Sequence, residues 1–326
     1  MNKIALLIMF MITFPVFAKQ DAEALYQQAV IPWEQGQSNS LELMLKAANA
    51  GHTEALCNIA RAYQGTAIIR SEEARQYFTK AAELGGLCGM IALSDLGSGF
   101  KLTEALTEDN GDNNWTRKAI EVTKERVKKN DIDAIKTYAF IVGISDYNGY
   151  CEWMEKAAAL GDADAMKQLA GHIESGCGWY LMPGSREKAA KYWLEQAANN
   201  GNPRAMEELG GLAYDAGNVS EMLNWFDKAI ETGNKNSLAM ASSFLMGHPV
   251  SSMPIDRIYQ DLKRAYSLNY ILTIKDPNDK DEDYSPYSKL KELNKKLTKS
   301  EIDSAKKWAE EWMKTHQVRT YGLVFN

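Results

Sequence analysis

Residues 188–217 read KAAKYWLEQAANNGNPRAMEELGGLAYDAG and decide the fold. An aromatic residue, Trp193, the leucine after it and two alanines fall on one face of a helix with about 3.6 residues per turn. Gly201 then ends this helix, because helices commonly close on a residue with positive φ. A second helix starts around Ala205 and ends near Gly217. The stretch therefore predicts an antiparallel pair of helices with small residues where they cross.

The phrase before Gly201 recurs along the chain. Copies read KAANAG at 46–51, KAAELG at 80–85, KAAALG at 156–161 and, more weakly, KAIETG at 228–233. Two degenerate copies place Asn130 and Asn269 where Gly is expected, and Asn is the next most suitable residue for a left-handed helix cap. The spacings between these anchors are 34, 45, 31, 40, 32 and 36 residues. Periods of about 20 to 50 residues indicate a solenoid of stacked repeats.

The combined pattern, KAxxW…AA..G…A…LG..Y..G, resembles the Sel1-like repeat family, which is related to tetratricopeptide repeats. Residues 188–217 carry the fullest match, and the likeness is weakest around 100–150, where Arg126 and Val127 replace the alanine pair. The resemblance implies an all-α chain, a right-handed α/α solenoid of about seven helix-pair repeats. The segment 297–312 is similar to the terminal helix that closes such arrays, and Ile302, Ala305, Trp308, Ala309 and Trp312 form its apolar stripe.

The N-terminus has the features of a secretory signal peptide. Lys3 is followed by an apolar run to Phe17, and Ala18 completes a cleavage site. The run is shorter than the roughly 20 residues that span a membrane. We therefore expect a signal peptide at 1–18, a repeat solenoid at 19–272, and an acidic loop with a capping helix at 273–326. We expect the mature chain in the periplasm, an oxidising compartment in which disulfides persist.

Four cysteines allow two disulfides. Cys151 stands near the start of one predicted helix and Cys177 near the end of its partner, and these two ends are neighbours in an antiparallel hairpin. A Cys151–Cys177 bridge would close about 27 residues and contribute about 3 kcal/mol. Cys57 and Cys88 lie on the second helices of consecutive repeats. That spacing leaves two alternatives open, a bridge or two buried thiols.

Motifs of catalysis and of metal binding are missing from the sequence. It contains no HExxH, no CxxC pair, no GxSxG, no P-loop and no Rossmann glycines. We expect no enzyme, no cofactor and no metal. His172 is interpreted as a packing residue, and a catalytic general base is the alternative. The segment 279–283 is either a solvated acidic loop or half a calcium loop, with Tyr284 where Gly is needed. The net charge of −6 argues against nucleic acid as a partner.

Two groups of residues are candidates for partner binding. Glu155, Glu195 and Asp227 each stand six residues before a repeat glycine, with Tyr192 and Asn224 on the same outward face. They form either an acidic column that favours a basic partner or an ordinary solvated face. Trp179 and Tyr180 lie in the apolar loop GWYLMPG at 178–184. This loop is either a binding hot spot or a cover for the gap between repeats.

The resemblance also implies a class of function. Exported members of the Sel1-like family suggest a periplasmic protein-binding module, first of all an immunity protein that occludes a type VI secretion effector such as a phospholipase. An adaptor in envelope or exopolysaccharide assembly is an alternative. A β-lactam-binding or β-lactam-hydrolysing enzyme, like cysteine-rich relatives, is a third. The sequence leaves open the partner, the face that binds it and the oligomeric state.

Overall fold

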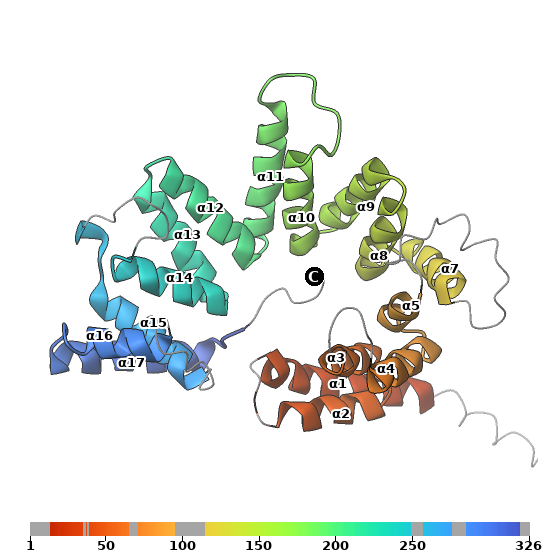
Figure 1. The fold of residues 1–326 in the computed structure, drawn as a ribbon, viewed down its shortest axis with the longest axis horizontal. Helices are drawn as coiled ribbons and strands as arrows, with labels where there is room; N and C mark the ends of the chain where they lie inside the picture. The colour runs from red at the N-terminus through yellow and green to blue at the C-terminus, as the bar shows by residue number, and fades with distance from the viewer. Residues whose placement is uncertain are drawn as a thin grey trace, which may run out of the picture. The chain divides into compact units, whose positions relative to one another are not determined.

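The computed structural model describes residues 14–34, 37, 39–64, 71–94, 115–248, 257–275 and 285–319 (Figure 1). Within these ranges the regular elements are helices, apart from one isolated β-bridge between Asn234 and Arg319. The prediction of an all-α repeat architecture is confirmed. The chain divides into two compact units, Met1–Leu160 with Cys177–Trp179, and Gly161–Gly176 with Tyr180–Asn326.

In the first unit each helix packs mainly on its neighbours in the chain, as stacked repeats require. Its helices are α1 (Phe14–Glu34), α2 (Ser40–Asn49), α3 (Thr53–Ala62), α4 (Glu72–Glu83), α5 (Leu87–Leu93), α7 (Trp115–Val127), α8 (Ile132–Gly143) and α9 (Tyr147–Ala159). The predicted signal peptide lies mostly outside the described residues, and α1 runs across the predicted cleavage point after Ala18. Among the residues searched, no helix is both long and apolar enough to cross a membrane.

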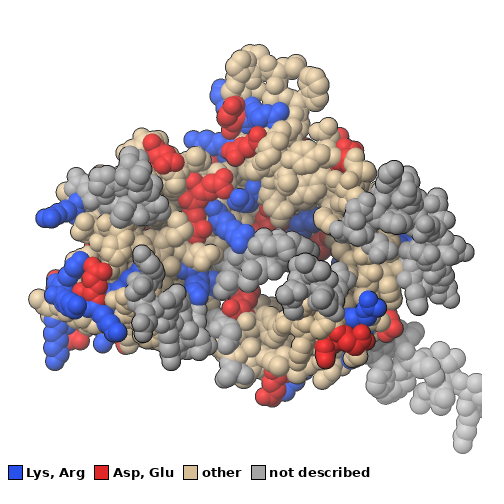
Figure 2. Space-filling model, viewed as in Figure 1, with Lys and Arg blue, Asp and Glu red and all other residues tan. Residues whose placement is uncertain are grey.

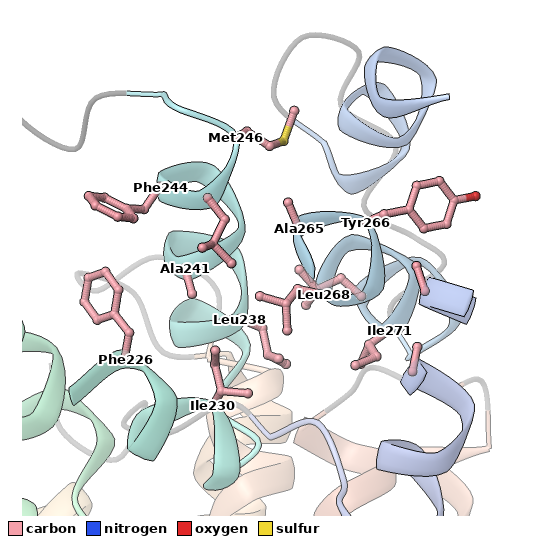
Figure 3. Packing of buried hydrophobic residues seen from close by; sticks show 14 of the residues in the cluster. Phe226, Ile230, Leu238, Ala241, Phe244, Met246, Ala265, Tyr266, Leu268 and Ile271 are labelled. Carbon is pink, nitrogen blue, oxygen red and sulfur yellow. The ribbon is translucent and has the colours of Figure 1, made fainter. Parts of the chain in front are cut away.

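The second unit continues the succession of helix pairs. Its helices are α10 (Ala163–Glu174), α11 (Ser185–Asn199), α12 (Pro203–Asp215), α13 (Val219–Glu231), α14 (Lys235–Leu245), the short 3-10 helix η3 (Arg257–Tyr259), α15 (Leu262–Lys275), α16 (Pro286–Leu293) and α17 (Lys299–Thr315). Figure 3 shows its core, in which Phe226 of α13 and Phe244 of α14 meet edge to face at 6.3 Å. The helix α15 adds Leu268 and Ile271 to the same buried cluster.

The turns between paired helices follow the pattern read from the sequence. Gly201 has φ 88°, and the next residue, Asn202, caps α12 because its Oδ1 accepts the N–H of Ala205 at 2.9 Å. Asn130 is the one described residue other than glycine with positive φ, at 55°. It therefore takes the left-handed conformation expected of a degenerate repeat anchor. An N-terminal side-chain cap such as that of Asn202 stabilises a helix by about 1 kcal/mol.

The prediction for Asn269 is wrong. This residue lies in the middle of α15 and is fully buried, so it ends no helix. Its side-chain amide donates to Ser242 Oγ at 2.6 Å and to the carbonyl of Ala265 at 2.8 Å. The buried residues Ile271 and Leu272 follow it, and burying them in the core extends the helix past the degenerate anchor.

The aromatic residue of the repeat and the residue after it, which share one predicted helix face, differ in burial. The residue after it is buried, for example Met154, Leu194 and Phe226, whereas Trp153 and Trp225 are only partly buried. Lysines three residues later cover these rings, with Lys156 Nζ 3.4 Å from the centre of Trp153 and Lys228 Nζ 4.1 Å from that of Trp225. These aromatic rings therefore line the edge of the core, under cation–π contacts.

In α17 the expected stripe is correct except at Trp308. Ala305, Ala309 and Trp312 are buried and Ile302 packs partly against them, but Trp308 is 41% exposed. The helix begins with a capping box, in which Thr298 and Glu301 satisfy each other's backbone N–H groups. The stripe is narrower than predicted because α15 covers only one side of the helix.

Both disulfides are present. Cys151 and Cys177 are joined with their Cα atoms 6.1 Å apart, which confirms the predicted repeat staple. Cys57 and Cys88 are also joined, with a Cα–Cα distance of 6.3 Å, so the alternative left open by the sequence resolves to a bridge between α3 and α5. Each closes a loop of about 30 residues, for which about 3 kcal/mol is expected.

Candidate protein-binding site

The connection between α10 and α11 carries exposed apolar side chains. It is ten residues long, 175–184, whereas the equivalent α12–α13 connection has three, 216–218. Three of its side chains are large, apolar and mostly in solvent: Trp179 is 87% exposed, Leu181 83% and Met182 73%. The tip of this loop, at the top of the view, carries no charged side chain in Figure 2. We call residues 178–184 the GWYLMPG loop.

The backbone on both sides of the loop is fixed locally. Gly176, Gly178 and Gly184 have φ of 115°, 78° and 75°, conformations that side-chain-bearing residues rarely adopt. Cys177 is buried and held by its disulfide to Cys151. At the far end, Ser185 donates from its hydroxyl to the carbonyl of Met182 at 2.6 Å. The loop is therefore anchored where it leaves α10 and where it enters α11.

Tyr180 points differently from its neighbours. It is partly buried, and the Arg186 guanidinium lies 5.0 Å from the centre of its ring. Arg186 also donates to the carbonyl of Ile173 at 2.6 Å. Of the two aromatic residues singled out from the sequence, Tyr180 thus packs on its own chain, and Trp179 faces solvent. Tyr180 fits the covering role and Trp179 the binding role.

The sequence singled out Trp179 and Tyr180 but assigned no role to Leu181 and Met182. Their exposure adds both side chains to the candidate surface. A signal was present, because these four residues form an unbroken large apolar run between two glycines. The pattern by itself could not tell an inward-facing run from an outward-facing one.

Two of the three acids of the predicted column form ion pairs within the chain. Asp227 Oδ1 lies 2.6 Å from Arg264 Nη2, and Glu195 lies 3.8 Å from Lys191 Nζ on the same helix. Glu155 is exposed on α9, in the first unit. Arg264 comes from α15, 37 positions further along the chain, so this pairing could not be read from the repeat pattern.

Two further predicted contact residues lie on outward helix faces. Tyr192 is 53% exposed on α11, where its ring meets Trp193 edge to face at 5.3 Å. Asn224 is exposed on α13. Tyr192 stands two turns along the helix that the GWYLMPG loop enters, which makes it the outward aromatic residue of the same hairpin.

A polar network links the second helices of successive repeats in the second unit. Lys167 of α10 pairs with Glu208 of α12 at 3.1 Å, and Glu207 accepts a hydrogen bond from Ser237 of α14. Burial raises the pKa of Glu207 above its ordinary value, against the opposing effect of Ser237. Burial, with help from the nearby Lys167 charge, lowers the pKa of His172, in keeping with its interpretation as a packing residue.

One hollow among the described residues lies in the second unit. It has a volume of about 630 Å³ and is lined by Leu245, Leu297 and the start of α15. Its acids serve the fold, since Asp261 accepts the N–H of Arg264 and Glu301 caps α17. No group of three or more His, Cys, Asp or Glu side chains within the residues searched could hold a metal ion.

Comparison with known proteins gives the following picture. No protein-family model and no curated protein matches this sequence. Among solved structures, a Sel1 repeat protein from Oxalobacter formigenes is 19% identical, with a TM-score of 0.38 over 74% of this chain and 94% of that one. The chain is similar to Sel1 repeat proteins.

Two other solved structures are similar. A protective antigen of uropathogenic Escherichia coli with an SLR fold is 18% identical, with a TM-score of 0.43 over 92% of this chain. This chain spans 62% of the length of that antigen. An immunity protein of Pseudomonas aeruginosa is 19% identical, with a TM-score of 0.41 over 79% of this chain and 84% of that one.

Proposed function

We propose that this chain is a periplasmic repeat module that binds another protein, and that the GWYLMPG loop is the centre of its binding surface. The observation that carries the proposal is the exposure of Trp179, Leu181 and Met182 within four consecutive residues. Trp is the residue most enriched in binding hot spots, and a buried aromatic side chain removes about 150–250 Å² from water. Burying such a cluster against a partner favours association, because apolar surface leaves water.

We place the module in the periplasm on two grounds. Both cysteine pairs are disulfide-bonded, and disulfides persist in oxidising compartments. The N-terminal 18 residues have the composition of a signal peptide. In this compartment we propose that the chain acts as an immunity protein, which occludes a secreted effector such as a phospholipase. Enzymatic activity has no part in this proposal.

The test is a comparison of variants of the mature chain. Trp179→Ala with Leu181→Ala removes two exposed side chains that make few contacts within the fold, so circular dichroism and the melting temperature should stay unchanged. Binding of the effector encoded beside the gene, followed by calorimetry, should weaken by about 100-fold, as expected when two hot-spot residues are truncated. Cells expressing the double variant should lose protection when that effector is delivered.

A matched control is Glu310→Ala, which alters an exposed residue of α17 outside the candidate surface. It should leave both affinity and protection unchanged. Full protection by a folded double variant would remove the loop from the binding surface. Absence of any effector or other protein partner for the wild-type chain would remove the function itself, and co-purification with envelope-assembly proteins would favour the adaptor role.

A further inference from the structure

We propose that the GWYLMPG loop is a preformed wedge that enters the apolar substrate cleft of an enzyme, so that inhibition results from plugging the cleft. This inference rests on the proposed function and names the class of partner. The occupied cleft would be one that normally holds a long apolar group, such as the acyl chain of a lipid. The argument depends on the composition, rigidity and surroundings of the loop.

The composition of the tip excludes a charged recess. All seven residues of the loop are uncharged, and the three most exposed side chains are apolar. A recess lined by charged groups would lose hydration on contact with this tip and gain no partner for those groups. Preformed concave apolar surfaces on soluble proteins are mostly ligand or substrate sites. The loop protrudes into solvent between two helices, so its counterpart must be concave (Figure 1).

The loop is longer than a connection between two helix pairs requires. The α12–α13 connection performs the same task with Ala216, Gly217 and Asn218. The seven additional residues of the α10–α11 connection place apolar side chains in water, which costs free energy in the isolated chain. A bound partner that covers these side chains recovers that free energy.

The loop is anchored on both sides, which favours tight binding. The disulfide at Cys177 fixes its start, and the Ser185–Met182 hydrogen bonds fix its end. Arg186 holds the ring of Tyr180 in place between these two points. A segment already ordered before binding loses less conformational entropy when it enters a pocket. The geometry is therefore that of a plug rather than of a flexible loop that folds on binding.

A second anchor lies on the adjoining helix. Tyr192 stands seven residues after the first residue of α11, about 10 Å along the helix at 1.5 Å per residue. It is half exposed and carries a hydroxyl that suits the polar rim of a cleft. Between the loop and Tyr192, the exposed Glu187, Lys188 and Lys191 provide a charged border around the apolar tip. This arrangement of an apolar centre and a polar rim is typical of protein interfaces.

A lipid surface is the other occupant that an apolar tip can reach. Stable attachment to a bilayer needs a second signal beside the apolar insertion, commonly a polybasic patch. The charges nearest the loop are balanced, with Glu174 and Glu187 against Arg186 and Lys188. The chain as a whole has a net charge of −6. The observations therefore favour a protein cleft over a bilayer.

The first experiment uses the full mature chain with p-benzoylphenylalanine in place of Trp179, and a matched control with the same probe in place of the exposed Trp308 of α17. Both are expressed in cells that contain the natural partners and then irradiated. We expect the probe at 179 to crosslink to a peptide that lines the substrate cleft of a lipid- or ester-hydrolysing enzyme, as mapped by mass spectrometry. The control should yield no crosslink to that peptide.

The second experiment uses the enzyme captured in this way. Wild-type chain should inhibit its hydrolysis of micellar phospholipid, and decanoic acid at saturating concentration should weaken the complex by about tenfold or more, because the fatty acid and the loop compete for one cleft. The triple variant Trp179→Ser, Leu181→Ser, Met182→Ser should lose about 100-fold or more in affinity while Tyr192→Ala loses about tenfold. Glu310→Ala should behave as wild type.

Specific outcomes overturn the inference. A crosslink outside the cleft, or a complex that decanoic acid leaves unchanged, removes the wedge but leaves protein binding intact. Sedimentation of the wild-type chain, but not the triple variant, with vesicles of phosphatidylethanolamine and phosphatidylglycerol makes the loop a membrane anchor instead. If the wild-type chain binds no protein and neither probe-bearing chain forms a crosslink to one, the proposed function fails together with the wedge.

Discussion

Two connections occupy equivalent places in successive repeats and differ in almost every respect. The α12–α13 connection consists of three residues, Ala216, Gly217 and Asn218. Gly217 has φ 76°, and Asn218 Oδ1 accepts the N–H of Glu221 at 3.2 Å. The α10–α11 connection spends ten, including a disulfide-bonded cysteine and three exposed apolar side chains. Both join one helix pair to the next.

The difference separates what the fold needs from what it carries in addition. Three residues suffice to end one helix, reverse the chain and cap the next. The extra residues of the GWYLMPG loop are therefore free to serve another purpose, and their exposure shows that core packing is not that purpose. The following predictions test this division, beginning with the largest expected effect.

Shortening the loop should abolish binding and leave the fold intact. Deletion of the five residues 179–183 removes every exposed apolar side chain between Gly178 and Gly184. We expect a loss of affinity of more than about 100-fold, equal to about 3 kcal/mol. The free energy of unfolding should change by less than about 1 kcal/mol, because loop length has a weak entropic effect. Urea unfolding and calorimetry measure the two quantities; a large stability loss would show that the loop covers a structural gap.

Removing the disulfide at the start of the loop should mainly reduce stability. Cys151→Ser with Cys177→Ser opens a cross-link over about 27 residues, so the free energy of unfolding should fall by about 3 kcal/mol. Affinity should fall by about tenfold, because a loop without the disulfide loses more conformational entropy on binding than the anchored loop does. Cys57→Ser with Cys88→Ser is the matched control, since it removes the bridge between α3 and α5, which does not anchor the loop. That control should lower stability and leave affinity unchanged.

The short connection should respond in the opposite way from the long one. Asn218→Ala removes the cap of α13 and should cost about 1 kcal/mol of unfolding free energy. Affinity should not change, because this connection carries no exposed apolar cluster. Asn218→Ser keeps a capping oxygen without placing a second carboxylate beside Glu221, and should restore most of the stability. If Asn218→Ala weakens binding as strongly as it weakens the fold, then the two connections are not functionally distinct.

The smallest effect concerns the dependence of stability on pH. Burial raises the pKa of Glu207 on α12, so the folded state binds its proton more tightly than the unfolded state, whose pKa is near 4.5. Its contribution is complete below that value and is lost as pH rises through the folded pKa. Glu207→Gln should therefore raise the melting temperature at pH 7. It should also reduce the decline of the melting temperature with rising pH above pH 4.5, in thermal scans from pH 4 to 7. A lower melting temperature of Glu207→Gln at pH 7 would contradict this account.

Local features of the fold could be predicted because each depends on neighbours in sequence. The glycine anchors follow from the positive φ that closes a helix, and Asn130 at φ 55° follows from the same requirement. The Cys151–Cys177 bridge follows from the geometry of one hairpin. The site was predicted only in part, since Trp179 was identified and Leu181 and Met182 were not assigned.

Other features depend on partners distant in the chain and could not be predicted. Asp227 is neutralised by Arg264 and Asn269 is buried against Ser242, each across the boundary between helix pairs. The repeat pattern treats Asp227 as outward and Asn269 as a cap, because it contains no information on which helix packs beside which. Trp153 lies at the edge of the core, and the position of Lys156 over its ring was likewise not given by the repeat pattern.

The sequence by itself determined the all-α repeat architecture, the glycine and Asn130 turns and one disulfide, because periodicity and backbone conformation act over a few residues. The tertiary structure alone decided the Cys57–Cys88 bridge, the pairing of the acidic face and the outward direction of the GWYLMPG loop. An apolar run has the same letters whether it points into a core or into water. Only the packed neighbours, or their absence around Trp179, Leu181 and Met182, distinguish the two.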